Sequence, residues 1–107
     1  MKIFDCFMFY DEELLLDIRM NILNDFVDYF IIVESKYFHN GNGRNLKFNI
    51  NNYSKFKDKI IYKVIDYEPN DLHKISKESP NYLKRLNSVK RIELSYNFME
   101  NATREAD

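Results

Sequence analysis

The sequence predicts an α/β fold, a mostly parallel sheet with flanking helices. Short apolar runs alternate with amphipathic segments in the order strand, helix, strand, loop, helix, strand and helix. The 107 residues include only two Gly and two Pro, so the elements should be long and no flexible linker divides the chain. We therefore expect a single domain over residues 1–107.

The beginning of the chain predicts a strand, a helix and a second strand. Residues 3–10 form an apolar and aromatic run, which is typical of a strand buried on both faces. Asp11 is expected to cap the helix that follows. Residues 29–33 form a second apolar run, which is rich in β-branched residues. Together these segments predict a right-handed βαβ unit.

The helix of this unit has a stripe of apolar side chains that we expect to face the sheet. The stripe repeats at helical spacing. Its members are Leu15, Ile18, Ile22 and Phe26, widened by Leu14 and Leu23.

The remaining elements follow a loop at residues 39–45. We predict a short helix at 53–59, a third strand at 59–65 and an irregular polar stretch at 68–79. A long amphipathic helix is expected from Pro80 onward. Its predicted apolar stripe comprises Tyr82, Leu86, Val89, Ile92, Tyr96 and Met99, and its predicted solvated face comprises Lys84, Arg85, Lys90, Arg91 and Glu100.

Composition excludes several classes of protein. The 16 basic and 17 acidic residues give a net charge of -1, which argues against a nucleic-acid-binding protein. Cys6 is the only cysteine, so neither an intrachain disulfide nor a cysteine-rich zinc site can form, and we expect an inert core thiol. The first residues resemble neither a signal peptide nor a transmembrane segment, and a cytoplasmic protein is expected.

Polar residues follow the first two predicted strands, where ligands bind in parallel sheets. Glu34 could accept hydrogen bonds from a nucleobase or a sugar hydroxyl, or it could be a solvated carboxylate at a strand end. Tyr10 could stack on a base or fill the sheet edge. The segment Gly41–Arg44 is typical of a turn, although Arg44 could also meet a diphosphate.

Other titratable residues give weaker signals. His39 and His73 have no nucleophile nearby in the sequence, so they predict no catalytic triad and are expected at the surface. Asp66 and Glu68 could approach a metal ion, but two carboxylates are weak evidence for a metal site.

Several segments together resemble a known family. They are Phe4–Glu12, Leu15–Leu23, Val27–Ser35, the glycines Gly41 and Gly43, Leu46–Phe48 and Lys59–Ile61. They resemble the N-terminal portion of the β-1,4-mannosyl-glycoprotein β-1,4-N-acetylglucosaminyltransferases, glycosyltransferase family 17. The resemblance is close over residues 3–65 and sparse over 66–107.

The resemblance implies a partial nucleotide-diphospho-sugar transferase fold, which is GT-A-like and Rossmann-like. It also implies an N-acetylglucosaminyltransferase-like enzyme that transfers a sugar from a UDP-sugar, such as UDP-GlcNAc, to a saccharide acceptor. By position, Tyr10 and Glu12 would border the uridine, and Glu34 would accept from uracil or ribose. Asp11 stands where the family often has Asn. With Arg44, these residues form the expected donor-binding set.

The sequence also departs from the family pattern. The family's Asp-x-Asp-Glu motif, which holds Mn²⁺ or Mg²⁺ against the diphosphate, does not occur in the 107 residues. The family has an Arg-Glu segment that Arg104–Glu105 could begin. We therefore expect the N-terminal, nucleotide-binding part of a longer transferase, and we do not expect this chain to be active alone.

Alternatives remain open. The chain could instead be a non-catalytic module that binds a UDP-sugar or serves as an interaction domain. The acceptor could be an N-glycan, a lipid-linked saccharide or a polysaccharide in biosynthesis. An exposed sheet edge would favour self-association.

Overall fold

The computed structural model describes residues 2–107 and confirms a small α/β fold with a parallel sheet. In chain order the elements are β1 (Phe4–Met8), α1 (Glu13–Leu23), β2 (Tyr29–Ser35), the 3₁₀ segment η1 (Ile50–Lys59), β3 (Ile60–Ile65) and α2 (Asn81–Ala106). The strand order is β1-β2-β3, and both strand pairs are parallel.

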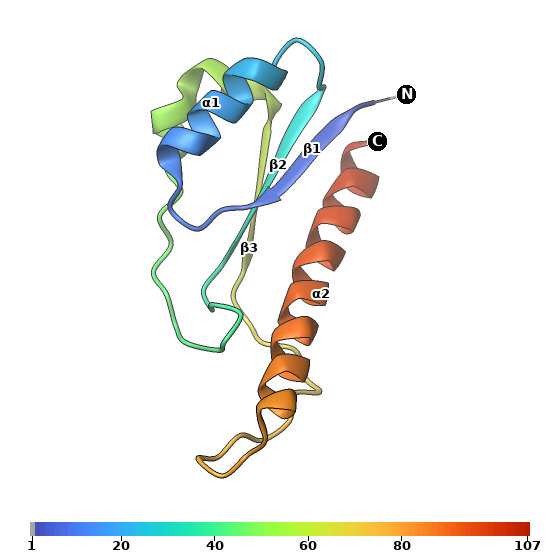
Figure 1. Ribbon diagram of the computed structural model, residues 1–107. Helices are drawn as coiled ribbons and strands as arrows, with labels where there is room; N and C mark the ends of the chain where they lie inside the picture. Colours follow the sequence, from blue (N-terminus) through green and yellow to red (C-terminus); the bar gives the residue numbers. More distant parts are fainter. Residues whose placement is uncertain (1) are drawn as a thin grey trace.

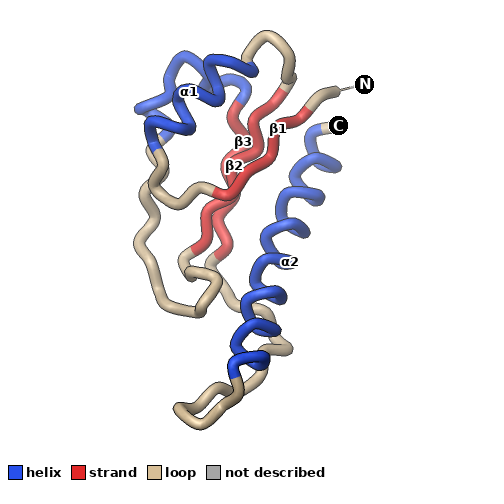
Figure 2. Tube along the Cα trace, in the orientation of Figure 1, coloured by secondary structure: helices blue, strands red, loops and turns tan. Residues whose placement is uncertain are grey.

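The two faces of the sheet are covered by different elements. α1 and η1 lie together on one face, and α2 runs along the other (Figure 1). Figure 2 shows the same layers, with the long loops between β2 and η1 and between β3 and α2. β2 is the central strand, and its residues from Phe30 to Ser35 are all buried.

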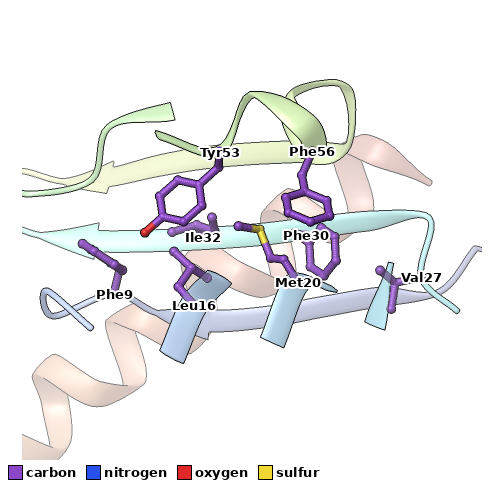
Figure 3. Close-up of a cluster of buried hydrophobic side chains, with 8 residues drawn as sticks. All are labelled: Phe9, Leu16, Met20, Val27, Phe30, Ile32, Tyr53 and Phe56. Atoms are coloured by element: carbon purple, nitrogen blue, oxygen red, sulfur yellow. The ribbon is translucent and has the colours of Figure 1, made fainter. Parts of the chain in front are cut away.

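The face below α1 holds the larger apolar cluster (Figure 3). The side chains of Phe30 and Ile32 in β2 pack in one cluster with Leu16 and Met20 of α1. The ring of Phe56 in η1 meets Phe30 edge-on, with centroids 6.0 Å apart. The other members are Phe9, Val27 and Tyr53.

The second cluster lies between the sheet and α2. It contains Ile31 and Val33 of β2 with Ile65 and Ala102. Because side chains alternate along a strand, the two faces of β2 supply one cluster each. This explains why the strand reads as an unbroken apolar run.

The prediction of which face of α1 is buried was wrong. The buried residues are Leu16 and Met20. The predicted stripe is exposed instead, at Leu14, Leu15, Ile18, Ile22 and Phe26, and only Leu23 packs against the core as expected. The helix carries two apolar stripes. The sheet contacts the stripe formed by Leu16, Met20 and Leu23, which continues at helical spacing to Val27 in the same cluster.

The predicted apolar stripe of α2 was also largely wrong. Tyr82, Leu86, Val89 and Tyr96 are exposed, whereas Met99 does pack against the sheet side. The buried residues of α2 are Asn87, Ser95 and Ala102. All three side chains are small, and Asn87 and Ser95 are hydrogen-bonded, so burial leaves neither polar group without a partner.

Candidate functional site

The candidate site lies where the carboxyl ends of β1 and β2 meet. β1 pairs with β2 in parallel, from Phe4 opposite Tyr29 to Met8 opposite Val33. The segment Phe9–Glu12 and the loop after Ser35 therefore leave the sheet at the same edge. This arrangement confirms the expected location of the polar residues at one end of the sheet.

Glu34 is fully buried and hydrogen-bonded by its own chain. Its Oε2 accepts from the backbone N–H of Lys47 at 2.6 Å, and its Oε1 accepts from that of Phe48 at 3.1 Å. The Tyr62 hydroxyl donates to Oε1 at 2.6 Å. Nη2 of Arg44 lies 3.0 Å from Oε2. The carboxylate therefore joins β2, β3 and the loop before η1.

Arg44 is also buried, with 5% of its side chain exposed. Besides pairing with Glu34, its Nη1 donates to the carbonyl oxygen of Ser35 at 2.7 Å. Its backbone N–H donates to the carbonyl oxygen of Lys36, which closes the loop back onto the end of β2. The guanidinium is thus directed into the protein and held by two acceptors.

Two aromatic rings lie beside this guanidinium. The Arg44 Cζ is 5.5 Å from the Tyr10 ring centroid and 5.7 Å from that of Phe38. The two rings are nearly parallel, at 10°, with centroids 6.5 Å apart. Phe38 is 42% exposed. An aromatic pair thus lies at the carboxyl ends of β1 and β2, next to an arginine whose charge is balanced by Glu34. Such an aromatic surface suits a planar ligand.

His39 belongs to this cluster, contrary to the expectation of an isolated surface residue. Its Nε2 lies 2.6 Å from the Tyr10 hydroxyl. Burial lowers the pKa of His39, and the positive charge of Arg91 lowers this pKa further. Burial also raises the pKa of Tyr10, with a partial offset from Arg44. Both shifts favour the neutral forms, which can share one hydrogen bond.

The turn between β1 and α1 has an unusual backbone. Among residues 2–107, Asp11 is the only non-glycine residue with a positive φ, which is 83°. α1 begins at Glu13 with Glu12 as N-cap, and no side chain caps it. The prediction that Asp11 caps the helix is therefore wrong. Asp and Asn enter the left-handed region more readily than most residues, so an Asn here would meet the same need.

Glu12 stabilises the same turn through a hydrogen bond of its side chain. Its Oε2 accepts from the backbone N–H of Tyr10 at 2.9 Å. Asp11 and Glu12 are both exposed. The structure therefore brings the five sequence-predicted residues to one end of the sheet, with Asp11 and Glu12 exposed, Tyr10 half-buried, and Glu34 and Arg44 inside.

The segment that contains Gly41 and Arg44 forms a turn, as expected. The Gly41 N–H donates to the carbonyl oxygen of Phe38, and Tyr37 forms an antiparallel bridge with Gly43. Gly41 has φ of 92°, and an added Cβ would lie 2.6 Å from Nη2 of Arg91. Only glycine fits at this turn without displacing the Arg91 guanidinium.

Arg91 links this turn to the opposite side of the molecule. Its Nε pairs with Oε1 of Glu68 at 2.8 Å, and its Nη1 donates to the carbonyl oxygen of His39 at 2.9 Å. The expectation that Arg91 lies on a solvated helix face is therefore wrong. No local sequence pattern predicts this cross-link, because the partners of Arg91 are 23 and 52 residues away.

An open polar hollow of about 590 Å³ lies next to Arg91. Residues of the 40–42 turn, the loop after β3 and the first half of α2 line it, including Asn40, Lys84 and Ser88. Asn87 fixes one wall of this hollow. Its side-chain Oδ1 accepts a hydrogen bond from the N–H of His73, and its Nδ2 donates one to the carbonyl oxygen of His73. Amide, hydroxyl and ammonium groups of this kind can hydrogen-bond a hydroxylated ligand.

The described residues do not fit a divalent metal ion. Within residues 2–107, no three His, Cys, Asp or Glu side chains converge in a way that could hold one. Glu68, one of the two carboxylates that the sequence suggested, is paired with Arg91. The helices within residues 2–107 are all too short or too polar to cross a membrane.

Comparison with known families identifies the class of protein. The sequence model of Glycosyltransferase family 17 matches residues 1–100. The chain therefore belongs to glycosyltransferase family 17, as its resemblance implied. A glycosyltransferase family acts on sugars, so sugar substrates are indicated. Comparison with curated proteins found no match, and comparison with solved structures found none either.

Proposed function

We propose that this chain binds the nucleotide of a UDP-sugar donor at the carboxyl ends of β1 and β2. It would thereby supply the donor-binding part of a GT-A-like transferase, which passes an N-acetylglucosamine-type sugar to a saccharide acceptor. Residues 1–107 would be one N-terminal domain of that enzyme. Family membership supports the transferase class, and the aromatic pair at the ends of the parallel strands supports the position of the donor.

The single observation that carries the proposal is the Tyr10–Phe38 pair, in which Phe38 is exposed and Tyr10 is half-buried. Aromatic rings stack on nucleobases regardless of sequence, and each stacked base contributes about 1–3 kcal/mol. Tyr10 is held in place by Arg44 beneath it and by His39 at its hydroxyl. A uracil ring stacked on this pair would lie beside the β1–α1 turn, where the exposed carboxylates of Asp11 and Glu12 can accept hydrogen bonds from ribose hydroxyls.

Glu34 and Arg44 take different roles in this proposal from those that the resemblance implied. All the Glu34 contacts described above are to its own chain, and the Arg44 guanidinium is directed inward. We therefore assign them as positioning residues, which fix the aromatic pair and the loop after β2. No step is assigned to a metal ion, because residues 2–107 offer no ligand set for one.

The test is calorimetric titration of the purified chain with UDP and UDP-N-acetylglucosamine, with and without Mn²⁺. We expect weak binding that Mn²⁺ does not change and that Tyr10→Ala reduces at least about tenfold. Tyr96→Ala is the matched control, because Tyr96 is an exposed tyrosine on α2. Absence of uridine nucleotide binding by the folded chain would overturn the proposal.

A labelled-sugar assay separates the enzyme from the alternative of a non-catalytic binding module. We expect the 107-residue chain to bind the donor without transferring it. Transfer to a saccharide by this chain alone would show that the donor-binding part already contains a complete catalytic centre.

A further inference from the structure

We propose that the polar hollow beside Arg91 is a saccharide-binding site, and that it holds the acceptor of the proposed transfer. The role of acceptor rests on the proposed function, whereas the site itself follows from the residues that line the hollow. Three features support this site: its fixed walls, the chemistry of its lining and its position next to the aromatic pair.

One wall of the hollow is a polar stripe on the first half of α2. Its residues recur every three or four positions, so they lie on one face of the helix. They are Lys84, Asn87, Ser88 and Arg91. This part of α2 therefore presents hydrogen-bonding groups to the hollow.

The other walls are held in place by contacts within the chain. Asn87 ties the loop after β3 to α2 through its two hydrogen bonds to His73. Arg91 ties the 40–42 turn to the same helix, because its Nη1 donates to the carbonyl oxygen of His39 at 2.9 Å. Walls that are fixed before a ligand arrives reduce the entropy that is lost on binding.

The polar groups of the lining fit sugar hydroxyls better than an anion. Asn42 and Ser88 offer both donors and acceptors, and Lys84 adds donors. The Glu68 carboxylate adds acceptors and balances the charge of Arg91 at 2.8 Å. A hydroxyl group both donates and accepts, whereas a phosphate group only accepts and would meet the negative charge of Glu68.

The size of the hollow and its aliphatic lining also suit a sugar. Its volume of about 590 Å³ lies within the range of about 300–1,000 Å³ for small-molecule sites. Leu72 and Ile75 line it as well, and Ile75 is 39% exposed. Their side chains can pack against the C–H groups of a sugar ring, which removes apolar surface from water. The ligand that fits best is therefore an uncharged saccharide.

The hollow and the aromatic pair are bordered by the same turn. Phe38 belongs to the pair, and Asn42 of this turn lines the hollow. Arg91 also lines the hollow and bonds the main chain of His39, whose ring contacts Tyr10. A saccharide in the hollow would therefore be a neighbour of a nucleotide stacked on the pair, as transfer between a donor and an acceptor requires.

The test is a titration of the isotope-labelled chain with three neutral disaccharides, followed by the chemical shifts of its amide groups. The disaccharides are N,N′-diacetylchitobiose, mannobiose and lactose. We expect at least one of them to shift the signals of Asn42 and Ser88, and inorganic phosphate at the same concentrations to leave these signals unchanged. Shifts with none of the three, or equal shifts with phosphate, would overturn the proposal.

Two pairs of substitutions separate the hollow from the rest of the surface. Asn42→Ala and Lys84→Ala should each weaken saccharide binding about three- to tenfold, because each removes a hydrogen-bonding group. Asn45→Ala and Arg85→Ala are the matched controls, since both residues are exposed and neither lines the hollow. Circular dichroism verifies that all four variants fold. Equal effects of variants and controls would place the saccharide elsewhere and contradict the assignment.

Tyr10→Ala distinguishes the saccharide site from the donor site. It should weaken UDP binding and leave saccharide binding unchanged, because Tyr10 does not line the hollow. UDP binding without saccharide binding would overturn the saccharide site alone. Saccharide binding without UDP binding would overturn the donor site, and with it the role of the saccharide as acceptor.

Discussion

Glu34 and Arg44 form a buried ion pair that holds the loop after β2. A buried pair contributes little relative to apolar residues, but removing one partner leaves an isolated charge, which costs about 3–5 kcal/mol. We therefore predict that Arg44→Met lowers the free energy of unfolding by about that amount in urea denaturation. Arg104→Met is the control, because Arg104 makes an exposed pair with Glu100 and should change stability by less than about 1 kcal/mol. Equal losses in the two variants would contradict the prediction.

His39 should make stability depend on pH. Its pKa is lowered in the folded chain, so between that value and the unfolded value of about 6.5 the unfolded chain binds more protons. The free energy of unfolding should therefore fall as the pH decreases below about 6.5 and level off above it. Urea denaturation from pH 5 to 8 measures this slope. In His39→Gln, which keeps a hydrogen-bonding side chain, the slope should be smaller, and an unchanged slope would assign the effect to other groups.

At the scale of an element, α1 shows why an apolar pattern can mislead. Leu14, Leu15 and Leu16 are consecutive, and each begins or flanks a stripe with helical spacing. Leu16 and Met20 face the sheet, whereas Leu15 and Ile18 are exposed. A sequence with two apolar stripes predicts the helix but does not reveal which stripe the core selects.

The two stripes should differ sharply in their effect on stability. We predict that Leu16→Ala lowers the free energy of unfolding by about 2–5 kcal/mol, because it opens a cavity in the core. Leu14→Ala, which truncates a 73% exposed side chain two residues away, should change it by less than about 0.5 kcal/mol. Thermal or urea denaturation checks both values. A larger loss for Leu14→Ala would mean that the predicted stripe is the buried one after all.

At the scale of the whole molecule, the parallel α/β fold follows from the sequence because β2 is apolar on both faces. The run Phe30–Val33 has no polar side to turn to solvent, so it must be a central strand covered by helices on both sides. Few glycines and prolines leave room for a helix as long as α2. Family membership was likewise recognisable from several short segments taken together.

The inner contacts of the candidate site could not be predicted in the same way. The sequence placed Glu34 and Arg44 near one edge, but their burial depends on Tyr62 and on the backbone of residues 47 and 48. Likewise His39 is held at the site by its ring contact with Tyr10 and by the bond from Arg91 of α2 to its carbonyl oxygen. Such contacts link residues far apart in sequence, and no local pattern encodes them.

The bonds of Glu34 also set an order of events during folding. Its hydroxyl partner, Tyr62, lies 28 residues later and opposes Ile32 in the β2–β3 register. The carboxylate can therefore be fully satisfied only after these parallel strands have paired, a non-local and comparatively slow step. Until then the Tyr62 contact that ties Glu34, and with it Arg44, to β3 is missing. The candidate site should thus be among the last parts of the chain to acquire protection from hydrogen exchange during refolding.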